Sequence, residues 1–275
     1  MMDVLKRSKV IVLFMVLFVL GFSLSAAAIT GREVMEKVDE RDTGETQHAL
    51  MGMDLIDKNG EVSPRTIEVW AEKYGDPADD LNKMVMVFHE PASVKNTRFL
   101  QIENKERDDD QWIYLPALQR VRRISASQGG DSFMGSDFTY DDMESRNIDD
   151  FTYQLLKEET VGKYECYVVE AIPKNPEEEQ YQKTISWITK EHFIPIRLEM
   201  YDKDSGKLYK LMTVEENIKK INGIWTIFST TMENLESGHK THLYIKQDKN
   251  GNYLIEYNKE ISDRRFTQQF LKTGK

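Results

Sequence analysis

The chain has 275 residues, of which 40% are hydrophobic and 31% charged, and its formal net charge is −10 at pH 7. Because an acidic chain repels the phosphate backbone, this balance disfavours a general nucleic-acid binder. Cys166 is the single cysteine, which excludes an internal disulfide framework and a metal site built from several cysteines.

Residues 1–28 have the pattern of a secretory signal peptide. A basic segment at residues 6–9 precedes the apolar run Val10–Phe22, and the small residues Ser25–Ala28 follow it. The run is shorter than the about 20 residues that a membrane-spanning helix needs. We expect cleavage near Ala28 and export to the periplasm, with a retained N-terminal anchor as the alternative. No cysteine follows the run, so no lipid anchor is expected.

Residues 29–275 are expected to form one domain built mainly from antiparallel strands. Gly31–Glu40 has apolar residues at helical spacing among charged ones and predicts a short amphipathic helix. The connections that follow are too short to hold the crossover helices of a parallel sheet. Dipeptides that favour tight hairpin turns divide the strands; they are Asn59-Gly60, Ser205-Gly206, Asn222-Gly223, Ser237-Gly238 and Asn250-Gly251.

The strands between these turns show two patterns. In the stretch 196–201, apolar and polar residues alternate with period two, as in a strand with one covered face. Met84–Phe88 and Trp112–Leu115 lack this alternation, which predicts strands that are covered on both faces. We expect roughly ten or eleven strands in one twisted meander, with further short helices over residues 140–147 and 262–271.

These elements favour a mainly β fold in which a large antiparallel sheet forms an incomplete, half-open barrel. The few short helices cannot cover both faces of such a sheet, so they are expected to act as a lid. A closed sandwich with a filled core is the alternative, and periodicity does not decide between the two.

The sequence lacks the motifs of common catalytic sites. It contains no nucleophile elbow, phosphate loop, zinc-protease motif or dinucleotide-binding glycine pattern. His239 and His242 stand three apart on an expected strand and therefore point to opposite faces, which disfavours a shared metal ion. We expect a protein that is not an enzyme and that binds no cofactor or metal.

Two neighbouring stretches form the most distinctive part of the chain: Asp108–Ile124 (DDDQWIYLPALQRVRRI) and Ser132–Phe138 (SFMGSDF). The first places aromatic and aliphatic residues on short extended segments, and the second is a glycine- and serine-containing loop with apolar side chains. Such a loop must find apolar partners or leave an apolar patch in water. This pattern points to a site for an apolar ligand.

Three arginines, Arg120, Arg122 and Arg123, stand within four residues in an otherwise acidic chain. On a strand, Arg122 and Arg123 point to opposite faces, so at least one arginine shares a face with apolar residues. A guanidinium is well suited to a phosphate or carboxylate headgroup. Pairing with the nearby carboxylates at residues 108–110 or 141–142 is the alternative.

These stretches resemble the outer-membrane lipoprotein-sorting protein family, a LolA-like group of exported domains. The resemblance covers nearly the whole chain after the expected signal peptide. Further matching segments are Gly31–Asp39, Leu55–Gly60, Asp202-Lys203, Gly223–Trp225 and Gly238–Thr241.

The resemblance implies an incomplete antiparallel β-barrel, closed by helices, with an apolar cavity for acyl chains. Ordinary core packing is the alternative for each aromatic side chain. The residues expected to line the cavity or its lid are Trp112, Tyr114, Leu115, Phe133, Met134, Phe138 and Trp187, and those expected at the headgroup or rim are Arg120, Arg122 and Arg123.

We therefore expect a periplasmic carrier that binds the acyl chains of a lipid or lipoprotein for transfer to the outer membrane. Its expected partners are those acyl chains, an inner-membrane export transporter and an outer-membrane acceptor. A non-enzymatic accessory subunit that docks on an export transporter is the alternative. An integral outer-membrane barrel is disfavoured because Glu68, Arg197 and Glu199 interrupt what would be its apolar band.

Overall fold

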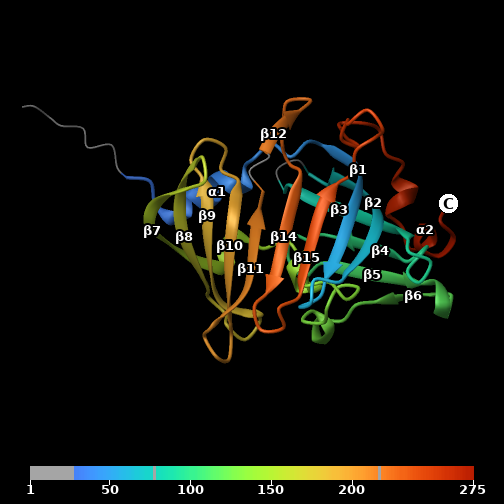
Figure 1. The fold of residues 1–275 in the computed structure, drawn as a ribbon, viewed down its shortest axis with the longest axis horizontal. Coiled ribbons are helices and arrows are strands. Elements are labelled where there is room, and N and C mark those ends of the chain that lie inside the picture. Colours follow the sequence, from blue (N-terminus) through green and yellow to red (C-terminus); the bar gives the residue numbers. More distant parts are fainter. Residues whose placement is uncertain (1–27, 77–78, 216–217) are drawn as a thin grey trace, which may run out of the picture.

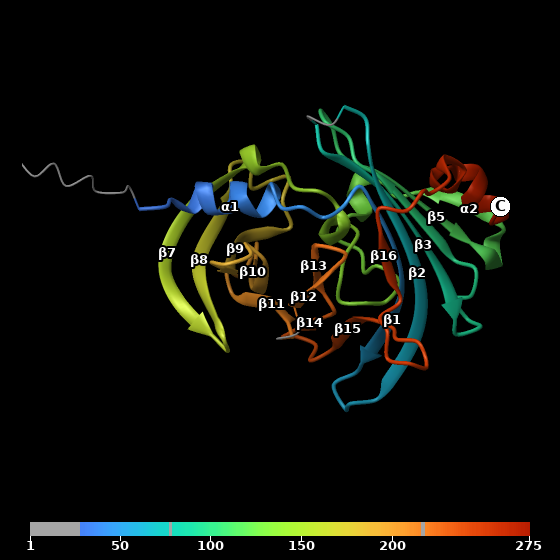
Figure 2. The ribbon, with the colours of Figure 1, turned by 90° about the horizontal axis from the view of Figure 1, so that it is seen from above.

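The protein is built around one antiparallel sheet that bends into a U, which Figure 2 shows from above. The computed structural model describes residues 28–76, 79–215 and 218–275, so the predicted signal peptide lies outside the described residues except for Ala28. The fourteen strands of the sheet are β1 (Thr46–Ile56), β2 (Val62–Tyr74), β3 (Leu81–Glu90), β4 (Arg98–Ile102), β5 (Asp110–Leu115), β6 (Arg120–Arg123), β7 (Phe151–Val161), β8 (Tyr164–Pro173), β9 (Tyr181–Thr189), β10 (Pro195–Asp202), β11 (Leu208–Val214), β14 (Ser229–Asn234), β15 (Lys240–Ile245) and β16 (Ile255–Tyr257).

The order of strands across the sheet is β6-β5-β4-β3-β2-β1-β15-β14-β11-β10-β9-β8-β7, and β16 pairs with the first part of β1. Strands β6 and β7 therefore lie at opposite edges, and the sheet does not close into a barrel (Figures 1 and 2). The prediction of a half-open antiparallel sheet is confirmed, and the alternative of a closed sandwich is wrong.

Four of the five predicted hairpin turns connect paired antiparallel strands. The fifth, Asn250-Gly251, is flanked by an isolated antiparallel bridge between Gln247 and Tyr253, and the strands on either side of it, β15 and β16, both pair with β1. In the separate two-stranded hairpin of β12 (Ile218–Ile221) and β13 (Ile224–Ile227), Asn222 and Gly223 have φ values of 51° and 92°. Positive φ at both central residues matches the right-handed twist of the flanking strands, which is why Asn-Gly is favoured there.

The expected number of strands was too low. The described residues form sixteen strands, and several of them, such as β12, β13 and β16, are only three or four residues long. A segment of that length is too short for a period of two to be recognised in the sequence.

The first predicted helix is confirmed as α1 (Gly31–Asp39). Thr30 and Glu33 form a capping box at its start, so the free backbone N–H groups of the first turn find partners. Val34, which is fully buried, packs α1 against Val169 of β8 and Ile188 of β9.

The other two predicted helices are only partly correct. Within residues 140–147 only a 3₁₀ turn forms, Asp141–Met143. Within 262–271 a 3₁₀ turn, η5 (Asp263–Phe266), precedes α2 (Gln268–Thr273). Thr267 separates the two with an extended φ of −133°, and its hydroxyl accepts a hydrogen bond from the Phe270 backbone N–H as the cap of α2.

The two faces of the sheet are covered by different parts of the chain. On the inner face of the U, Phe88 and Phe99 belong to a cluster that includes residues of the connection between β6 and β7. On the outer face, Val85 and Val87 pack against Phe270 and Leu271 of α2 (Figure 2). The prediction that Met84–Phe88 is covered on both sides is therefore confirmed.

Within the described ranges, no helix is both long and apolar enough to span a bilayer.

Candidate functional site

One long connection runs through the hollow of the U. Residues 124–150, here called the crossing segment, join β6 at one edge of the sheet to β7 at the other (Figure 2). Apart from short 3₁₀ turns and one isolated bridge between Ser132 and Thr139, the crossing segment has no regular structure. The inner face is thus covered by an irregular segment rather than by a second sheet, and this region is the candidate binding site.

Phe133 is the main apolar contact between the crossing segment and the inner face. Its side chain is only 1% exposed. The ring lies edge-on to Phe99 at a centroid distance of 5.0 Å and to Tyr140 at 5.6 Å, and it is tilted against Phe88 at 6.1 Å. Such aromatic pairs contribute about 0.5–1.5 kcal/mol each beyond the burial of area. In this structure the aromatic core beneath the crossing segment is therefore well packed.

Asp137 anchors the crossing segment to β15. Its backbone N–H donates to the Thr241 hydroxyl (2.9 Å), and that hydroxyl donates in turn to the Asp137 carboxylate (2.7 Å). His239 Nδ1 lies 2.7 Å from the same carboxylate oxygen. Because Thr241 is fully buried and Asp137 nearly so, these bonds are shielded from competing water.

A buried ion pair provides a second anchor, on the other half of the sheet. Lys210 of β11, 2% exposed, places Nζ 3.0 Å from the carboxylate of Asp142 in the crossing segment. Tyr181 of β9 donates a hydrogen bond to the second oxygen of this carboxylate (2.9 Å). Burial raises the pKa of Tyr181 first, and the negative charge of Asp142 adds to the rise, so this hydroxyl remains a donor.

The crossing segment is also bonded to the half of the sheet that contains β4 and β5. The Gln111 side chain donates to the Tyr140 carbonyl (3.0 Å), and the Gln101 side chain donates to the Met143 carbonyl (2.6 Å). Asp109 accepts from the backbone N–H of Ser145 (3.1 Å). The crossing segment is therefore held by polar side chains from both halves of the U.

The end of the crossing segment lines an acidic cleft of about 610 Å³. Burial, together with the nearby carboxylates of Asp141 and Asp109, raises the pKa of Glu144 in this cleft to about 7. Among the residues that the structure describes, no group of His, Cys, Asp and Glu side chains has the arrangement of a metal site.

The predicted cavity residues divide between the two faces of the sheet. Leu115, Met134 and Phe138 pack with Phe133 on the inner face. Trp112 and Tyr114 point to the outer face and pack in the cluster that contains α2. The structure therefore brings four of the seven predicted residues together.

Trp187 also lies away from the crossing segment. Its neighbour Ile188 points to the inner face and contacts α1, so Trp187 points to the outer face by strand alternation. There its indole N–H donates to Glu159 (2.7 Å), and the Arg197 guanidinium lies over its ring at 4.9 Å.

The three predicted rim arginines are exposed on the edge strand β6. Arg120 and Arg122 pair in register with Leu115 and Ile113 and so share the side of the inner face. Arg123 points to the other side and forms an ion pair with Asp110 (2.5 Å), which is the alternative considered from the sequence.

Sequence reasoning did not assign an anchoring role to Lys210, Thr241 or His239, which hold the crossing segment. Lys210 carried a usable signal, because strand alternation places it on the same face as Met212 and Val214. A charge at such a position predicts a buried ion pair, although the sequence does not identify the partner.

The comparison with protein-family models matches residues 80–273 to a family described as uncharacterized protein. A search of functionally curated proteins gave no match. Among solved structures, a domain named for outer-membrane lipoprotein sorting from Vibrio parahaemolyticus is 30% identical, with a TM-score of 0.78. That match covers 88% of this chain and 98% of the domain.

Two further solved structures are similar. A DUF1329 family protein from Desulfovibrio piger is 30% identical, with a TM-score of 0.79, over 88% of this chain and 97% of that protein. A LolA superfamily protein from Nitrosomonas europaea is 24% identical, with a TM-score of 0.64, over 88% of this chain and all of that protein, which supports the fold alone.

The half-open sheet with its few short helices is the fold of the LolA superfamily. The chain belongs to the family that includes the lipoprotein-sorting domain from Vibrio parahaemolyticus and the DUF1329 protein from Desulfovibrio piger.

Proposed function

We propose that this protein is a carrier that binds the acyl chains of a lipid or lipoprotein on the inner face of the U and carries them toward the outer membrane. The observation that carries the proposal is the way in which the inner face is covered. An apolar sheet surface lies under one irregular segment that is held at a few polar points. Membership of the lipoprotein-sorting family supports the same conclusion.

The energetics of transfer favour an exchange between acyl chain and crossing segment. Burial of one methylene is worth about 0.8 kcal/mol, so a sixteen-carbon chain gains on the order of 12 kcal/mol when it leaves water. An incoming chain would replace the contacts that Phe133 makes with Phe99 and Phe88. The anchors at Asp137 and Asp142 would then favour return of the crossing segment once the chain has left.

On this proposal nine of the ten predicted site residues have a definite role, and Arg123 is paired with Asp110 instead. Phe133, Met134 and Phe138 form the movable cover, and Leu115 belongs to the surface beneath it. Arg120 and Arg122, exposed at the edge on the inner side, would meet the anionic headgroup. Trp112, Tyr114 and Trp187 would support the sheet from the outer face.

The proposal also includes export and delivery. Residues 1–28 would be removed as a signal peptide, and residues 29–275 would act as a single carrier domain in the periplasm. An inner-membrane export transporter would supply the cargo, and an outer-membrane acceptor would receive it. No catalytic step is needed, because a gradient of apolar affinity suffices to move the chain.

Native mass spectrometry of the full chain purified from cells tests the proposal. We expect a population of protein with bound acyl ligand that organic solvent extracts. Protein that is uniformly empty, and that also takes up no fluorescent fatty acid from phosphatidylglycerol vesicles, would contradict it. Empty protein that co-purifies with a membrane transporter would instead support the accessory-subunit alternative.

A matched pair of variants locates the site. Phe133→Ala removes the main competitor of the acyl chain, so fatty-acid affinity should rise by about tenfold. Leu100→Ala removes an equally buried apolar side chain from the outer face and should leave the affinity unchanged. Equal effects of the two substitutions would place the acyl chain somewhere other than the inner face.

A further inference from the structure

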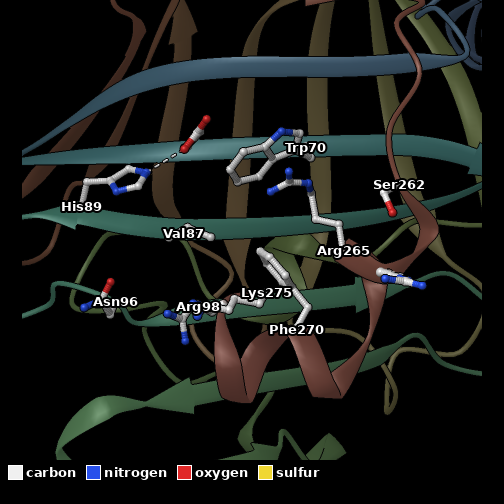
Figure 3. A pocket seen from close by; sticks show the side chains of 12 residues that line it. Trp70, Val87, His89, Asn96, Arg98, Ser262, Arg265, Phe270 and Lys275 are labelled. Atoms are coloured by element: carbon white, nitrogen blue, oxygen red, sulfur yellow. Dashed lines mark hydrogen bonds and ion pairs between the residues drawn. The ribbon is translucent and has the colours of Figure 1, made fainter.

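A second cavity lies on the outer face, on the opposite side of the sheet from the crossing segment. It has a volume of about 560 Å³ and opens between β2–β4 and the C-terminal elements η5 and α2 (Figure 3). The carrier function uses the inner face, so nothing described above assigns a role to this outer pocket.

The outer pocket is cationic in an otherwise acidic protein. Four of the residues that line it carry a basic side chain: Arg98, Arg264, Arg265 and Lys275. No ion pair of the three arginines is found within the described part of the chain. Within these residues no carboxylate is directly paired with the arginines, and Glu68 attracts Arg265 only at longer range.

The one acidic side chain that lines the pocket is already engaged elsewhere. Glu68 places one oxygen 2.8 Å from His48 Nε2. Its other oxygen lies 2.8 Å from His89 Nε2, a contact that the dashed line marks in Figure 3. Because both oxygens face imidazoles, the carboxylate does not form a direct pair with Arg265. An anion that enters the pocket would meet guanidinium groups without displacing a carboxylate partner.

Arg265 is held in a fixed position by aromatic rings. Its guanidinium stacks on Trp70 at 3.9 Å and lies 5.3 Å from the centre of the Phe270 ring (Figure 3). Its Nε is buried without a hydrogen-bond partner. A guanidinium stacked on an aromatic face keeps its in-plane N–H groups available, in a fork that matches the oxygens of a phosphate or carboxylate.

Arg98 provides a second guanidinium. One terminal nitrogen donates to the Leu271 carbonyl at 2.9 Å, which leaves the other N–H groups free to bind a ligand. Burial lowers the pKa of both Arg98 and Arg265. A cation that is partly removed from water without an ion-pair partner lowers the stability of the folded protein. A bound anion would offset this cost.

We propose that the outer pocket binds an anionic phosphate group, held by Arg265 and Arg98, with Phe270 and Val87 against the apolar body to which that group is attached. The volume exceeds that of an inorganic anion, and the aromatic walls suit a phosphate ester. A phospholipid headgroup and a free phosphate share this chemistry. The inference does not rest on the carrier function, because the pocket lies on the other face.

Isothermal titration calorimetry of the full chain at low salt tests the proposal with two probes, inorganic phosphate and dihexanoyl phosphatidylglycerol below its micelle concentration. We expect saturable binding of both, weakened by added salt. Phosphatidylglycerol bound at least about tenfold more tightly than phosphate identifies a lipid headgroup as the ligand, and equal affinities identify free phosphate.

Three glutamine variants show whether the pocket is the site. Arg265→Gln should weaken both probes by about tenfold or more, because it removes a charge-assisted bidentate contact. Arg264→Gln, at an exposed position on η5, leaves the packing intact and should weaken them by a few-fold. Lys58→Gln, at an exposed position on the turn between β1 and β2, is the control for the loss of one positive charge and should have no effect.

Two results would overturn the proposal. The first is the absence of saturable binding of either probe by the native protein up to about 10 mM. The second is native affinity in both Arg265→Gln and Arg264→Gln when circular dichroism shows that they are folded. If no fatty acid binds to the inner face, the outer pocket can still either bind or fail to bind the two probes. The two sites are therefore tested independently.

Discussion

At the scale of single residues, Lys210 allows the sharpest test of how the crossing segment is held. Its described counter-ion is Asp142, and both side chains are buried. Lys210→Met should lower the free energy of unfolding by about 3–5 kcal/mol, because an unpaired carboxylate would remain buried. Urea unfolding with an unchanged m-value measures the loss.

The double variant Lys210→Met/Asp142→Asn is the control for this prediction. Asparagine keeps an acceptor for the Tyr181 hydroxyl but carries no charge. The double variant should therefore recover at least half of the lost stability. If Lys210→Met alone loses less than about 1 kcal/mol of unfolding free energy, the Asp142 carboxylate is hydrated when its partner is removed.

Glu144 predicts a pH dependence of stability. Its pKa rises from 4.5 to about 7 in the folded state, mainly through burial. Between these two values the unfolded chain loses this proton while the folded protein keeps it, so the contribution of Glu144 to stability falls as pH rises through this window. Above about pH 7 Glu144 is ionised in the folded protein too, and the full cost of burying its charge lowers the stability.

Glu144→Gln removes this penalty and should stabilise the protein at pH 8 by about 1–2 kcal/mol, with little effect at pH 4.5. Thermal unfolding of both proteins across this range measures the difference. Exposed Glu61→Gln, on the turn between β1 and β2, is a control for the change of net charge. A difference that stays constant with pH would contradict the assignment to Glu144.

Residue roles were only partly readable from the sequence. Strand alternation correctly separates Arg122 from Arg123, because side chains on neighbouring positions point to opposite faces. The same reasoning cannot show that Asp137 meets Thr241 and His239, which follow it by about a hundred residues. Partnership over such a distance depends on how the whole sheet bends.

At the scale of elements, α2 is a short helix whose stability depends on packing. Leu271 is fully buried against the outer face, in the cluster that contains Val85 and Leu100. Leu271→Ala should cost about 2–5 kcal/mol in unfolding free energy, because a helix this short has little stability of its own. Chemical denaturation measures it, with exposed Lys272→Ala as a control expected within about 0.5 kcal/mol.

The elements that the sequence predicted well are those with strong local determinants. Asn222-Gly223 forms its turn because the dipeptide itself favours positive φ. The start of α1 is fixed by the capping box of Thr30 and Glu33, two residues that are close together in the sequence. Residues 140–147 do not form the expected helix. Their backbone is instead fixed from outside, by Gln111 at the Tyr140 carbonyl and Gln101 at the Met143 carbonyl.

At the scale of the whole molecule, the bend of the sheet decides which residues become the site. The prediction of a half-open sheet followed from the resemblance and from the scarcity of helices. Period-two patterns identify two faces but do not say which of them is concave. For that reason Trp112 and Tyr114 were grouped with Phe133, although strand alternation places them on the outer face.

The curvature also leaves the crossing segment spanning the hollow between the two edges of the sheet, and this leads to the final prediction. If an acyl chain replaces the crossing segment, the backbone amides of Asp137 and Ser145 lose their present acceptors, the Thr241 hydroxyl and the Asp109 carboxylate. Hydrogen exchange at these amides should become at least about tenfold faster when palmitate binds, while amides of β1–β3 should keep their protection.

Asp137→Asn provides the control in the absence of ligand. It removes the charge from the bonds to Thr241 and His239, so the same amides should exchange about tenfold faster with no palmitate present. Slower hydrogen exchange in the crossing segment when palmitate binds would mean that the acyl chain lies against the side of the segment that faces away from the sheet. The crossing segment would then not open to admit the acyl chain. The inner face would then be a permanent core, and the cargo would have to bind elsewhere on the sheet.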